Sequence, residues 1–196
     1  KALEKKNPIA LLPTGAGKSL TYQIASLLQP GLTIVVDPIK SLMKDQNENL
    51  QNASIDGTVY INANLSATEK RINIQRYCEG EFLFAFVSPE RFVIDDFREA
   101  IASIPNYHRN FSYCVIDEAH CVSEWGHDFR TPYLNLGENA IQFCKTFDET
   151  HIPIFGLTAT ASFDVLADIE RELKINRNDG KAVIRYENTV RDEINY

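Results

Sequence analysis

Short apolar runs alternate with segments of helical periodicity along most of this chain, and this alternation restricts the possible folds more than any other feature. Near-continuous apolar runs are typical of strands buried on both faces of a parallel sheet. Their regular alternation with helices predicts an α/β fold with a doubly wound, mainly parallel sheet and helices on both faces. We expect strands at residues 9–12, 33–36, 58–61, 82–87, 113–116 and 154–157, and helices at residues 18–28, 39–51, 67–79, 91–101, 134–147 and 164–173.

Local signals set the boundaries of this fold. Ser66 and Glu69 have the spacing of a capping box, which predicts the start of the third helix. Beyond residue 173 the pattern weakens: residues 176–180 read as a polar turn, and residues 182–186 as a last strand. We therefore predict one lobe over residues 1–188 and the start of a connection to a further domain at residues 189–196.

Composition is that of an ordinary globular domain, with 196 residues, 44% hydrophobic and 24% charged. No apolar run approaches the roughly 20 residues that a membrane helix needs. Residues 1–7 are polar and lack the apolar core of a secretory signal. The chain begins without Met, so we expect it to be a piece of a longer protein.

The cysteines and the net charge bear on compartment and partners. None of the cysteines forms a C-x-x-C pair or has zinc-finger spacing to a histidine, which predicts free thiols in a reducing cytoplasm and no structural zinc. The net charge of −7 gives no support for nucleic-acid binding, so any such contact must come from local patches. The cysteines are Cys78, Cys114, Cys121 and Cys144.

A glycine-bearing turn joins the first predicted strand to the first predicted helix. Gly15 and Gly17 allow successive backbone N–H groups to point at phosphate oxygens, and the helix N-terminus adds its unpaired donors. Lys18 would contact the β- and γ-phosphates, and the Ser19 hydroxyl would bind Mg²⁺. Because Leu12 stands where the strict phosphate-loop pattern has glycine, a chance glycine-rich turn remains an alternative. The proposed nucleotide-binding residues are Pro13, Thr14, Gly15, Ala16, Gly17, Lys18 and Ser19.

A second candidate site follows the buried strand at residues 113–116. Asp117 and Glu118 are adjacent carboxylates at the end of that strand, where they would repel each other and resist desolvation. A divalent cation relieves that conflict if Asp117 binds Mg²⁺ and Glu118 orients and deprotonates the attacking water. The alternative is a solvated strand end with two ordinary surface acids. His120 reads either as a core histidine or as a relay of nucleotide state.

Three segments together resemble motifs I, II and III of superfamily 2 helicases: residues 14–19, residues 117–120 and residues 157–161. The resemblance implies a RecA-like lobe that binds ATP and Mg²⁺, with Lys18, Asp117, Glu118 and His120 as catalytic residues. Motif I of that superfamily commonly lacks the first glycine, which accounts for Leu12.

The chain further resembles the RecQ family of DNA helicases. Residues 41–46 are similar to its motif Ia, residues 88–91 to its motif Ib, and residues 121–130 to its aromatic-rich loop, which couples single-stranded DNA binding to ATP hydrolysis. Base stacking on aromatic rings would let an acidic lobe bind a strand without a basic surface. The DNA-binding or coupling residues implied by the resemblance are Lys44, Arg91, Trp125, His127, Phe129, Arg130, Thr158 and Thr160. Read alone, Lys44 and Arg91 are solvated helix residues, Trp125 is core filling, and the threonines cap the helix before Asp164.

The chain also departs from the RecQ pattern. Asp37 and Lys40 stand where the family is less charged, since the segment before Ser41 is usually Ser-Pro-Leu-Ile. Residues 131–133 replace the usual Pro-x-Tyr. The adenine-reading glutamine, the arginine finger, the second lobe and the zinc-bearing segment of the family are not in this chain.

The resulting expectation is the N-terminal motor lobe of a RecQ-like, ATP-dependent 3′-to-5′ DNA helicase, monomeric, with single-stranded or junction DNA and a second RecA-like lobe as partners. We expect it in the cytoplasm, with the nucleoid if bacterial, or in the nucleus if eukaryotic. Another superfamily 2 translocase or an RNA helicase is the near alternative. A small-molecule kinase or nucleotide switch would have the complete glycine motif and an arginine-rich lid. A binding module with a decayed ATPase would not keep Lys18, Ser19, Asp117 and Glu118 together.

Overall fold

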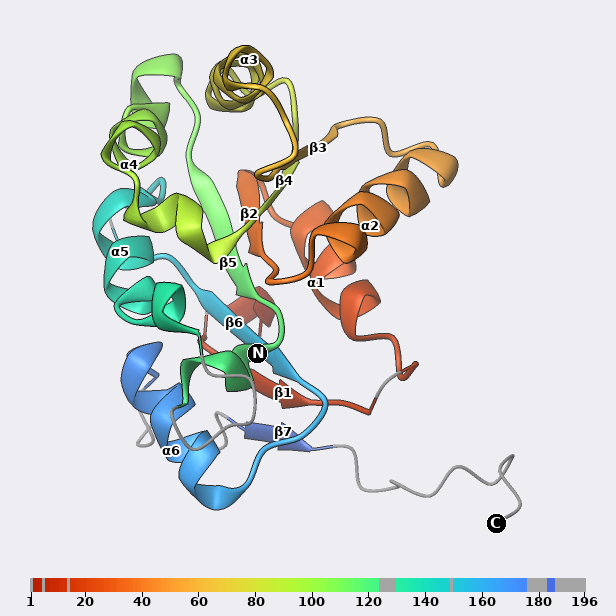
Figure 1. The fold of residues 1–196 in the computed structure, drawn as a ribbon, viewed down its shortest axis with the longest axis vertical. Helices are drawn as coiled ribbons and strands as arrows, with labels where there is room; N and C mark the ends of the chain where they lie inside the picture. The colour runs from red at the N-terminus through yellow and green to blue at the C-terminus, as the bar shows by residue number, and fades with distance from the viewer. Residues whose placement is uncertain are drawn as a thin grey trace.

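A single parallel sheet forms the centre of the protein, in a computed structural model that describes residues 2–4, 6–13, 15–123, 130–148, 150–175 and 183–185 (Figure 1). Within these residues seven strands pair in the order β3-β4-β2-β5-β6-β1-β7, and every pairing is parallel. The predicted doubly wound α/β fold is therefore confirmed. The strands are β1 (Ile9–Leu11), β2 (Leu32–Val36), β3 (Thr58–Ile61), β4 (Phe84–Val87), β5 (Phe111–Ile116), β6 (Ile154–Thr158) and β7 (Val183–Arg185).

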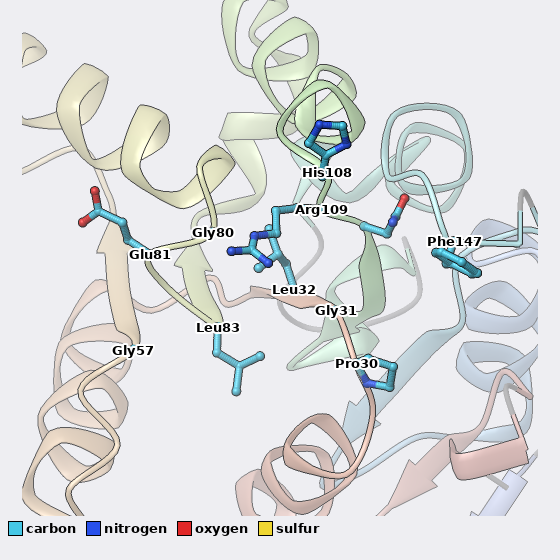
Figure 2. A pocket seen from close by; sticks show the side chains of 11 residues that line it. Pro30, Gly31, Leu32, Gly57, Gly80, Glu81, Leu83, His108, Arg109 and Phe147 are labelled. Carbon is cyan, nitrogen blue, oxygen red and sulfur yellow. The ribbon is translucent and has the colours of Figure 1, made fainter.

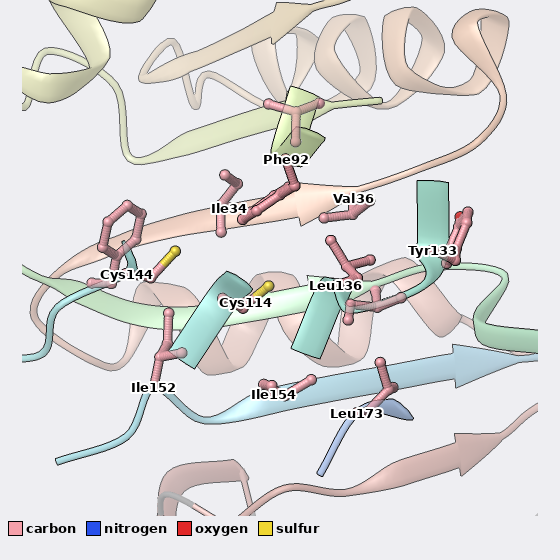
Figure 3. Close-up of a cluster of buried hydrophobic side chains, with 14 of the residues drawn as sticks. Ile34, Val36, Phe92, Cys114, Tyr133, Leu136, Cys144, Ile152, Ile154 and Leu173 are labelled. Carbon is pink, nitrogen blue, oxygen red and sulfur yellow. The ribbon is translucent and has the colours of Figure 1, made fainter. Parts of the chain in front are cut away.

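Helices cover both faces of the sheet, because alternate residues of the buried strands point to opposite sides. Ile34 and Val36 of β2 belong to the apolar cluster under α3 to α6, whereas Val35 belongs to the cluster under α1 and α2 (Figures 1 and 3). Both clusters are fully enclosed, which explains why the strands read as continuous apolar runs. The helices are α1 (Lys18–Leu27), α2 (Lys40–Asn52), α3 (Ala67–Cys78), α4 (Asp95–Ala102), α5 (Leu136–Phe143) and α6 (Phe163–Glu172).

The start of α3 follows its sequence signal. Ser66 Oγ accepts a hydrogen bond from the Glu69 backbone N–H at 3.2 Å, and Glu69 Oε2 accepts one from the Ser66 N–H at 2.8 Å. The capping box is confirmed. The four cysteines are buried and free, as predicted.

Two predicted helices differ from the structure. Residues 91–101 do not form one helix: the 3₁₀-helix η2 (Pro89–Val93) ends at the extended Ile94, and α4 begins at Asp95. The β-branched Ile94 favours extended backbone, and the acidic first turn of α4 suits a helix N-terminus. The helix predicted at residues 134–147 is only α5, because Asn135 adopts a left-handed conformation before it.

The sheet order brings distant segments to one edge. Since all strands are parallel, β1, β2, β5 and β6 end at the same side, and β6 lies between β1 and β5. The residues after these strands therefore surround one location, at the edge where α/β folds bind ligands. Among the described residues, no helix combines the length and apolar character needed to cross a bilayer.

Candidate active site

The turn between β1 and α1 has the backbone of an anion-binding loop. Gly15 and Gly17 have φ values of 83° and 80°, in the left-handed region that favours glycine. A Cβ on Gly17 would meet only the Leu20 side chain at 3.9 Å, so conformation and not space requires the glycine. No side chain caps the N-terminus of α1. The first backbone N–H groups of this helix therefore have no side-chain acceptor and can bind an anion at the loop. Thr14 lies outside the described residues.

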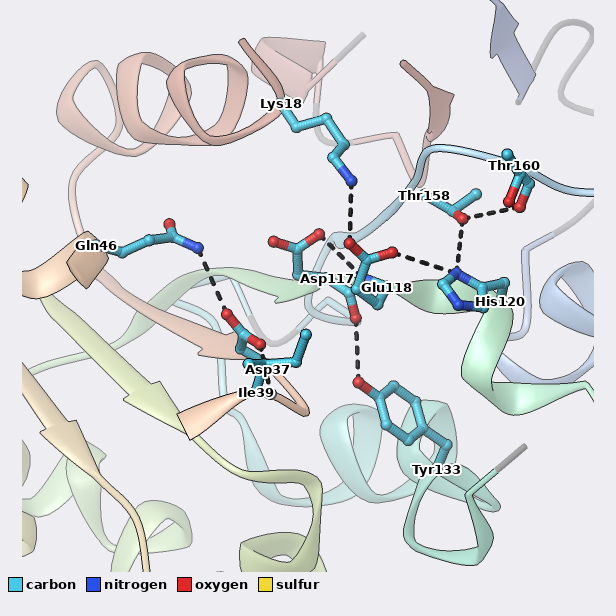
Figure 4. A network of polar contacts seen from close by, with 10 residues as sticks. All are labelled: Lys18, Asp37, Ile39, Gln46, Asp117, Glu118, His120, Tyr133, Thr158 and Thr160. Atoms are coloured by element: carbon cyan, nitrogen blue, oxygen red, sulfur yellow. Dashed lines mark hydrogen bonds and ion pairs between the residues drawn. The ribbon is translucent and has the colours of Figure 1, made fainter. Parts of the chain in front are cut away.

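Lys18 connects this loop to the end of β5. Its Nζ atom lies 3.2 Å from Glu118 Oε1, although the two residues are 100 positions apart (Figure 4). Both side chains are largely buried, with 13% and 22% exposure. The structure thus brings together the two motifs that the sequence placed in one site.

Asp117 and Glu118 occupy unlike environments despite being adjacent. Asp117 is 5% exposed, and burial raises the pKa of its carboxyl. Its Oδ1 accepts a hydrogen bond from the Glu118 N–H at 2.9 Å, and its backbone carbonyl accepts one from the Tyr133 hydroxyl at 3.1 Å. Glu118 has a φ of 48°, which is uncommon for a non-glycine residue and concentrates at functional sites.

His120 connects the β5 end to the β6 end. Its Nδ1 lies 2.9 Å from Thr158 Oγ1 and 3.3 Å from Glu118 Oε2, and Thr158 Oγ1 donates to the Thr160 carbonyl at 3.0 Å. Hydrogen bonds to Cys121 and Glu118 raise the pKa of His120 to about 10, so at neutral pH its Nδ1 carries one N–H that the two oxygens share. The contact with His120 in turn lowers the pKa of Glu118. Glu118 is therefore ionised, as a base must be.

The residues at this edge suit Mg²⁺. That ion usually keeps several waters and takes one or two carboxylates together with substrate phosphates. Asp117 and the hydroxyl of Ser19, in the first turn of α1, could supply such a partial set. No group of three His, Cys, Asp or Glu side chains capable of holding a metal occurs in the described part of the chain. The assignment of Ser19 and Asp117 stays a prediction.

Three further side chains complete the site, and the sequence did not assign them to it. Asp37, at the end of β2, is fully buried, and Gln46 of α2 donates to its Oδ2 at 3.5 Å. The Tyr22 hydroxyl of α1 makes a short hydrogen bond to Gln46 Oε1. In the sequence, Asp37 was marked by its unusual charge and Gln46 only by its place in the segment that resembles motif Ia.

The predicted DNA contacts lie on separate elements. Lys44 is exposed on α2 and pairs with Glu48 at 3.4 Å, as an ordinary surface ion pair would. Arg91 is half-buried on η2, and its Nε is buried without a hydrogen-bond partner. Arg130 is exposed, and its Nη1 donates to the Pro38 carbonyl at 3.1 Å. Thr160 is exposed, and Ser162, not a threonine, caps α6. Trp125, His127 and Phe129 lie outside the described residues, as do residues 189–196.

A pocket of about 600 Å³ opens at the opposite edge of the sheet, where β2, β3 and β4 begin (Figure 2). Arg109 reaches across it between Gly80 and Leu32, and Phe147 is an exposed part of its wall. Glu81, which also lines the pocket, forms an ion pair at 2.7 Å with Arg76, a residue outside the pocket lining. None of the catalytic side chains lines it, so the chemistry belongs to the carboxyl edge.

Comparison with known proteins agrees with this geometry. The sequence profile described as "DEAD/DEAH box helicase" matches residues 1–169. The chain is 39% identical over 170 residues to the ATP-dependent DNA helicase RecQ of Pasteurella multocida, covering 87% of this chain and 25% of the relative. It is 38% identical over 175 residues to RecQ of Bacillus subtilis, covering 89% and 28%, and 36% identical over 177 residues to the helicase SGS1 of Saccharomyces cerevisiae, covering 88% and 12%. The chain thus spans about a quarter of the length of the RecQ relatives.

Solved structures share the fold at low identity. The helicase domain of Hef from Pyrococcus furiosus superposes with a TM-score of 0.61 at 17% identity, covering 94% of this chain and 35% of that one. A hypothetical ATP-dependent RNA helicase from Sulfolobus tokodaii superposes with a TM-score of 0.65 at 16% identity, covering 94% and 49%. Both likenesses support the RecA-like arrangement of the sheet.

Proposed function

Because this chain belongs to the DEAD/DEAH box helicase family, we propose that it is the ATP-binding motor lobe of a RecQ-like helicase, coupling ATP hydrolysis to 3′-to-5′ translocation on DNA and its unwinding. The contact between Lys18 Nζ and Glu118 Oε1 carries the proposal, since it unites the phosphate loop with the carboxylates at 3.2 Å. The DNA substrate is favoured by relatives of 36–39% identity that are named DNA helicases. The 3′-to-5′ direction rests on the RecQ resemblance.

Each part of the site has a separate role in the proposed hydrolysis of ATP. The N–H groups of the loop and the Lys18 ammonium bind the phosphates of ATP, and Ser19 and Asp117 would hold Mg²⁺, which neutralises developing charge on those phosphates. Glu118 orients the attacking water and accepts its proton. His120 and Thr158 connect Glu118 to the end of β6 and, through it, to the predicted DNA face.

We further propose that a second RecA-like lobe and single-stranded or junction DNA are its partners, and that the protein acts as a monomer in the cytoplasm, or in the nucleus of a eukaryote. An arginine supplied from another domain is worth roughly 10³–10⁵ in the rate of phosphoryl transfer. This chain by itself should therefore bind nucleotide weakly and hydrolyse little.

The test is the ATPase activity of the full-length protein with and without oligo(dT) or oligo(U). We expect stimulation by the DNA, loss of turnover in Lys18→Ala, and loss of stimulation with nucleotide binding retained in Trp125→Ala. Phe147→Ala, which removes an exposed aromatic ring at the opposite edge, should behave as wild type. Equal stimulation by RNA would indicate a different superfamily 2 motor, and full turnover by Lys18→Ala would refute the catalytic assignment.

A further inference from the structure

The peptide group between Asp117 and Glu118 is held at both of its polar atoms. Its N–H donates to Oδ1 of the Asp117 side chain at 2.9 Å, and its carbonyl accepts a hydrogen bond from the Tyr133 hydroxyl at 3.1 Å (Figure 4). The first contact lies between adjacent residues, whereas the second comes from a residue 16 positions further along the chain. Tyr133 is therefore the residue through which another segment of the fold holds this peptide.

The orientation of this peptide sets the backbone of Glu118. Glu118 is left-handed, with φ 48° and ψ 47°. For a residue with a side chain this region is less favourable than the ordinary helical and extended regions, so the conformation persists only where the surroundings impose it. Because a peptide group is planar, rotating the carbonyl of Asp117 also turns the Glu118 N–H and changes its φ. The contact with Tyr133 opposes that rotation.

The contacts at the end of the Glu118 side chain do not replace this backbone contact. Oε1 lies 3.2 Å from Lys18 Nζ, and Oε2 lies 3.3 Å from His120 Nδ1. In the proposed function the Lys18 ammonium binds the phosphates of ATP, so it is not free to fix the carboxylate during hydrolysis. The hydrogen bond from Tyr133 does not involve the nucleotide and can persist when ATP is bound.

Tyr133 is itself held rigidly. Its side chain is fully buried in the same apolar cluster as Ile116 and Leu136 (Figure 3). Its backbone N–H donates to the Arg130 carbonyl at 2.9 Å, at the end of the 3₁₀-helix η5 (Thr131–Tyr133). Burial raises the pKa of the Tyr133 hydroxyl, so the group keeps the hydrogen that it donates. A buried aromatic ring with one polar atom gives the peptide carbonyl a fixed partner.

We propose that Tyr133 is a positioning residue for Glu118. Its hydroxyl fixes the peptide between Asp117 and Glu118, and thereby keeps the Glu118 carboxylate where it accepts the proton of the attacking water. The proposal rests on the proposed function, since it takes Glu118 as the base. Loss of the hydroxyl should therefore slow hydrolysis without weakening the binding of ATP.

The experiment measures the steady-state ATPase of the full-length protein with saturating oligo(dT), together with calorimetric binding of a non-hydrolysable ATP analogue. Tyr133→Phe removes the hydroxyl and keeps the ring in the core. We expect kcat to fall roughly tenfold, since a misplacement of about 1 Å at a reacting group can cost ~10²-fold. The KM for ATP and the affinity for the analogue should stay at the wild-type values, and retained affinity also reports that the variant is folded.

Tyr77→Phe is the matched control. Tyr77 is a second fully buried tyrosine, on α3, and its hydroxyl has no hydrogen-bond partner among the described residues. Removing that hydroxyl takes the same atom from the same apolar cluster without touching the site. This variant should keep the wild-type kcat, and a tenfold loss in both variants would overturn the role of Tyr133.

A double variant tests whether the effect passes through Glu118. Glu118→Gln lacks the base, so Tyr133→Phe has no carboxylate left to misplace. Single-turnover hydrolysis by the double variant should therefore stay within about twofold of Glu118→Gln alone. A further fall by the full factor would show that Tyr133 acts on another group and would overturn the proposal.

The remaining outcomes separate this inference from the function on which it rests. Wild-type protein without ATPase activity stimulated by oligo(dT) would refute the proposed function itself. Wild-type kcat in Tyr133→Phe, with or without a raised KM, would refute the role of Tyr133 and leave that function intact.

Discussion

The Nδ1 atom of His120 lies 2.9 Å from the hydroxyl oxygen of Thr158, so one side-chain contact joins the end of β5 to the end of β6. The same nitrogen lies 3.3 Å from the carboxylate of Glu118, and the Thr158 hydroxyl donates a hydrogen bond to the Thr160 carbonyl. A change at Glu118 can therefore alter the segment that follows β6 through three consecutive polar contacts. These three contacts are a physical route for the predicted coupling between nucleotide hydrolysis and DNA binding.

Thr158→Val should uncouple the two sites while preserving the fold. Valine keeps the shape of the buried threonine but cannot accept from the imidazolium, and a hydrogen bond to a charged group is worth roughly 1.5–3 kcal/mol. We expect DNA stimulation of the ATPase to fall about tenfold with ATP affinity unchanged. Thr33→Val, which removes a buried strand hydroxyl that contacts Ser112 at 3.1 Å, is the matched control. Undiminished stimulation in Thr158→Val would refute the coupling role.

Glu118→Gln should separate nucleotide binding from hydrolysis. The amide keeps the shape of the side chain but cannot accept the proton of the attacking water, a contribution of ~10²–10⁴ in rate. We expect ATP turnover in the DNA-stimulated, full-length protein to fall by that factor, with ATP binding measured by calorimetry retained. Glu99→Gln, at an exposed position of α4, serves as the control and should turn over ATP normally.

Asp37 should make the fold less stable as pH rises. Burial raises the pKa of its carboxyl from an ordinary 3.8 to about 7, so between these values the folded state retains a proton that the unfolded chain has released. The stability contributed by Asp37 is fully present below about pH 4 and is lost as pH rises through 7, with a slope of at most about 1.4 kcal/mol per pH unit. Urea unfolding of the metal-free protein between pH 4 and 8 should show this slope, and the difference between wild type and Asp37→Asn isolates it. Parallel curves for the two proteins would contradict the burial of an ionisable group at this position.

Ser66→Ala should destabilise the protein by ~1 kcal/mol, the usual value for loss of an N-cap side chain. The Ser66 hydroxyl satisfies the Glu69 N–H at the start of α3, and alanine would leave that donor without its partner. The midpoint of urea unfolding reports the change. Thr68→Ala, at an exposed position in the first turn of the same helix, should be neutral or slightly stabilising because alanine has the higher helix propensity. An equal loss in both variants would mean that the cap contributes nothing specific.

Local sequence information predicted those parts of the fold that depend on neighbouring residues. Continuous apolar runs predicted β2 and β5 because both of their faces are covered, and the spacing of Ser66 and Glu69 predicted the start of α3. The same reasoning was wrong at residues 91–101, where apolar periodicity suggested one helix. There the extended Ile94 separates two short helices, and Phe92 of the first packs against Phe97 of the second, with their rings 5.7 Å apart and 77° between their planes.

The candidate site, like the fold, contains some residues that the sequence predicts and others that it does not. Lys18, Asp117 and Glu118 could be found from the sequence because each belongs to a short motif whose chemistry requires those side chains at that spacing. The position of Asp37 beside Asp117 could not be found, because it depends on β2 and β5 being neighbours and on their register. That pairing joins segments about 80 residues apart, and no local pattern encodes it.

The sequence by itself therefore determined the α/β class, the phosphate loop and the pair of acidic residues, since each arises from interactions within one strand, turn or helix. Only the tertiary structure decided that β6 lies between β1 and β5, and that a second buried aspartate stands beside Asp117. The physical reason is that strand order and side-chain neighbours follow from burying both sheet faces at once, which is a property of the whole chain.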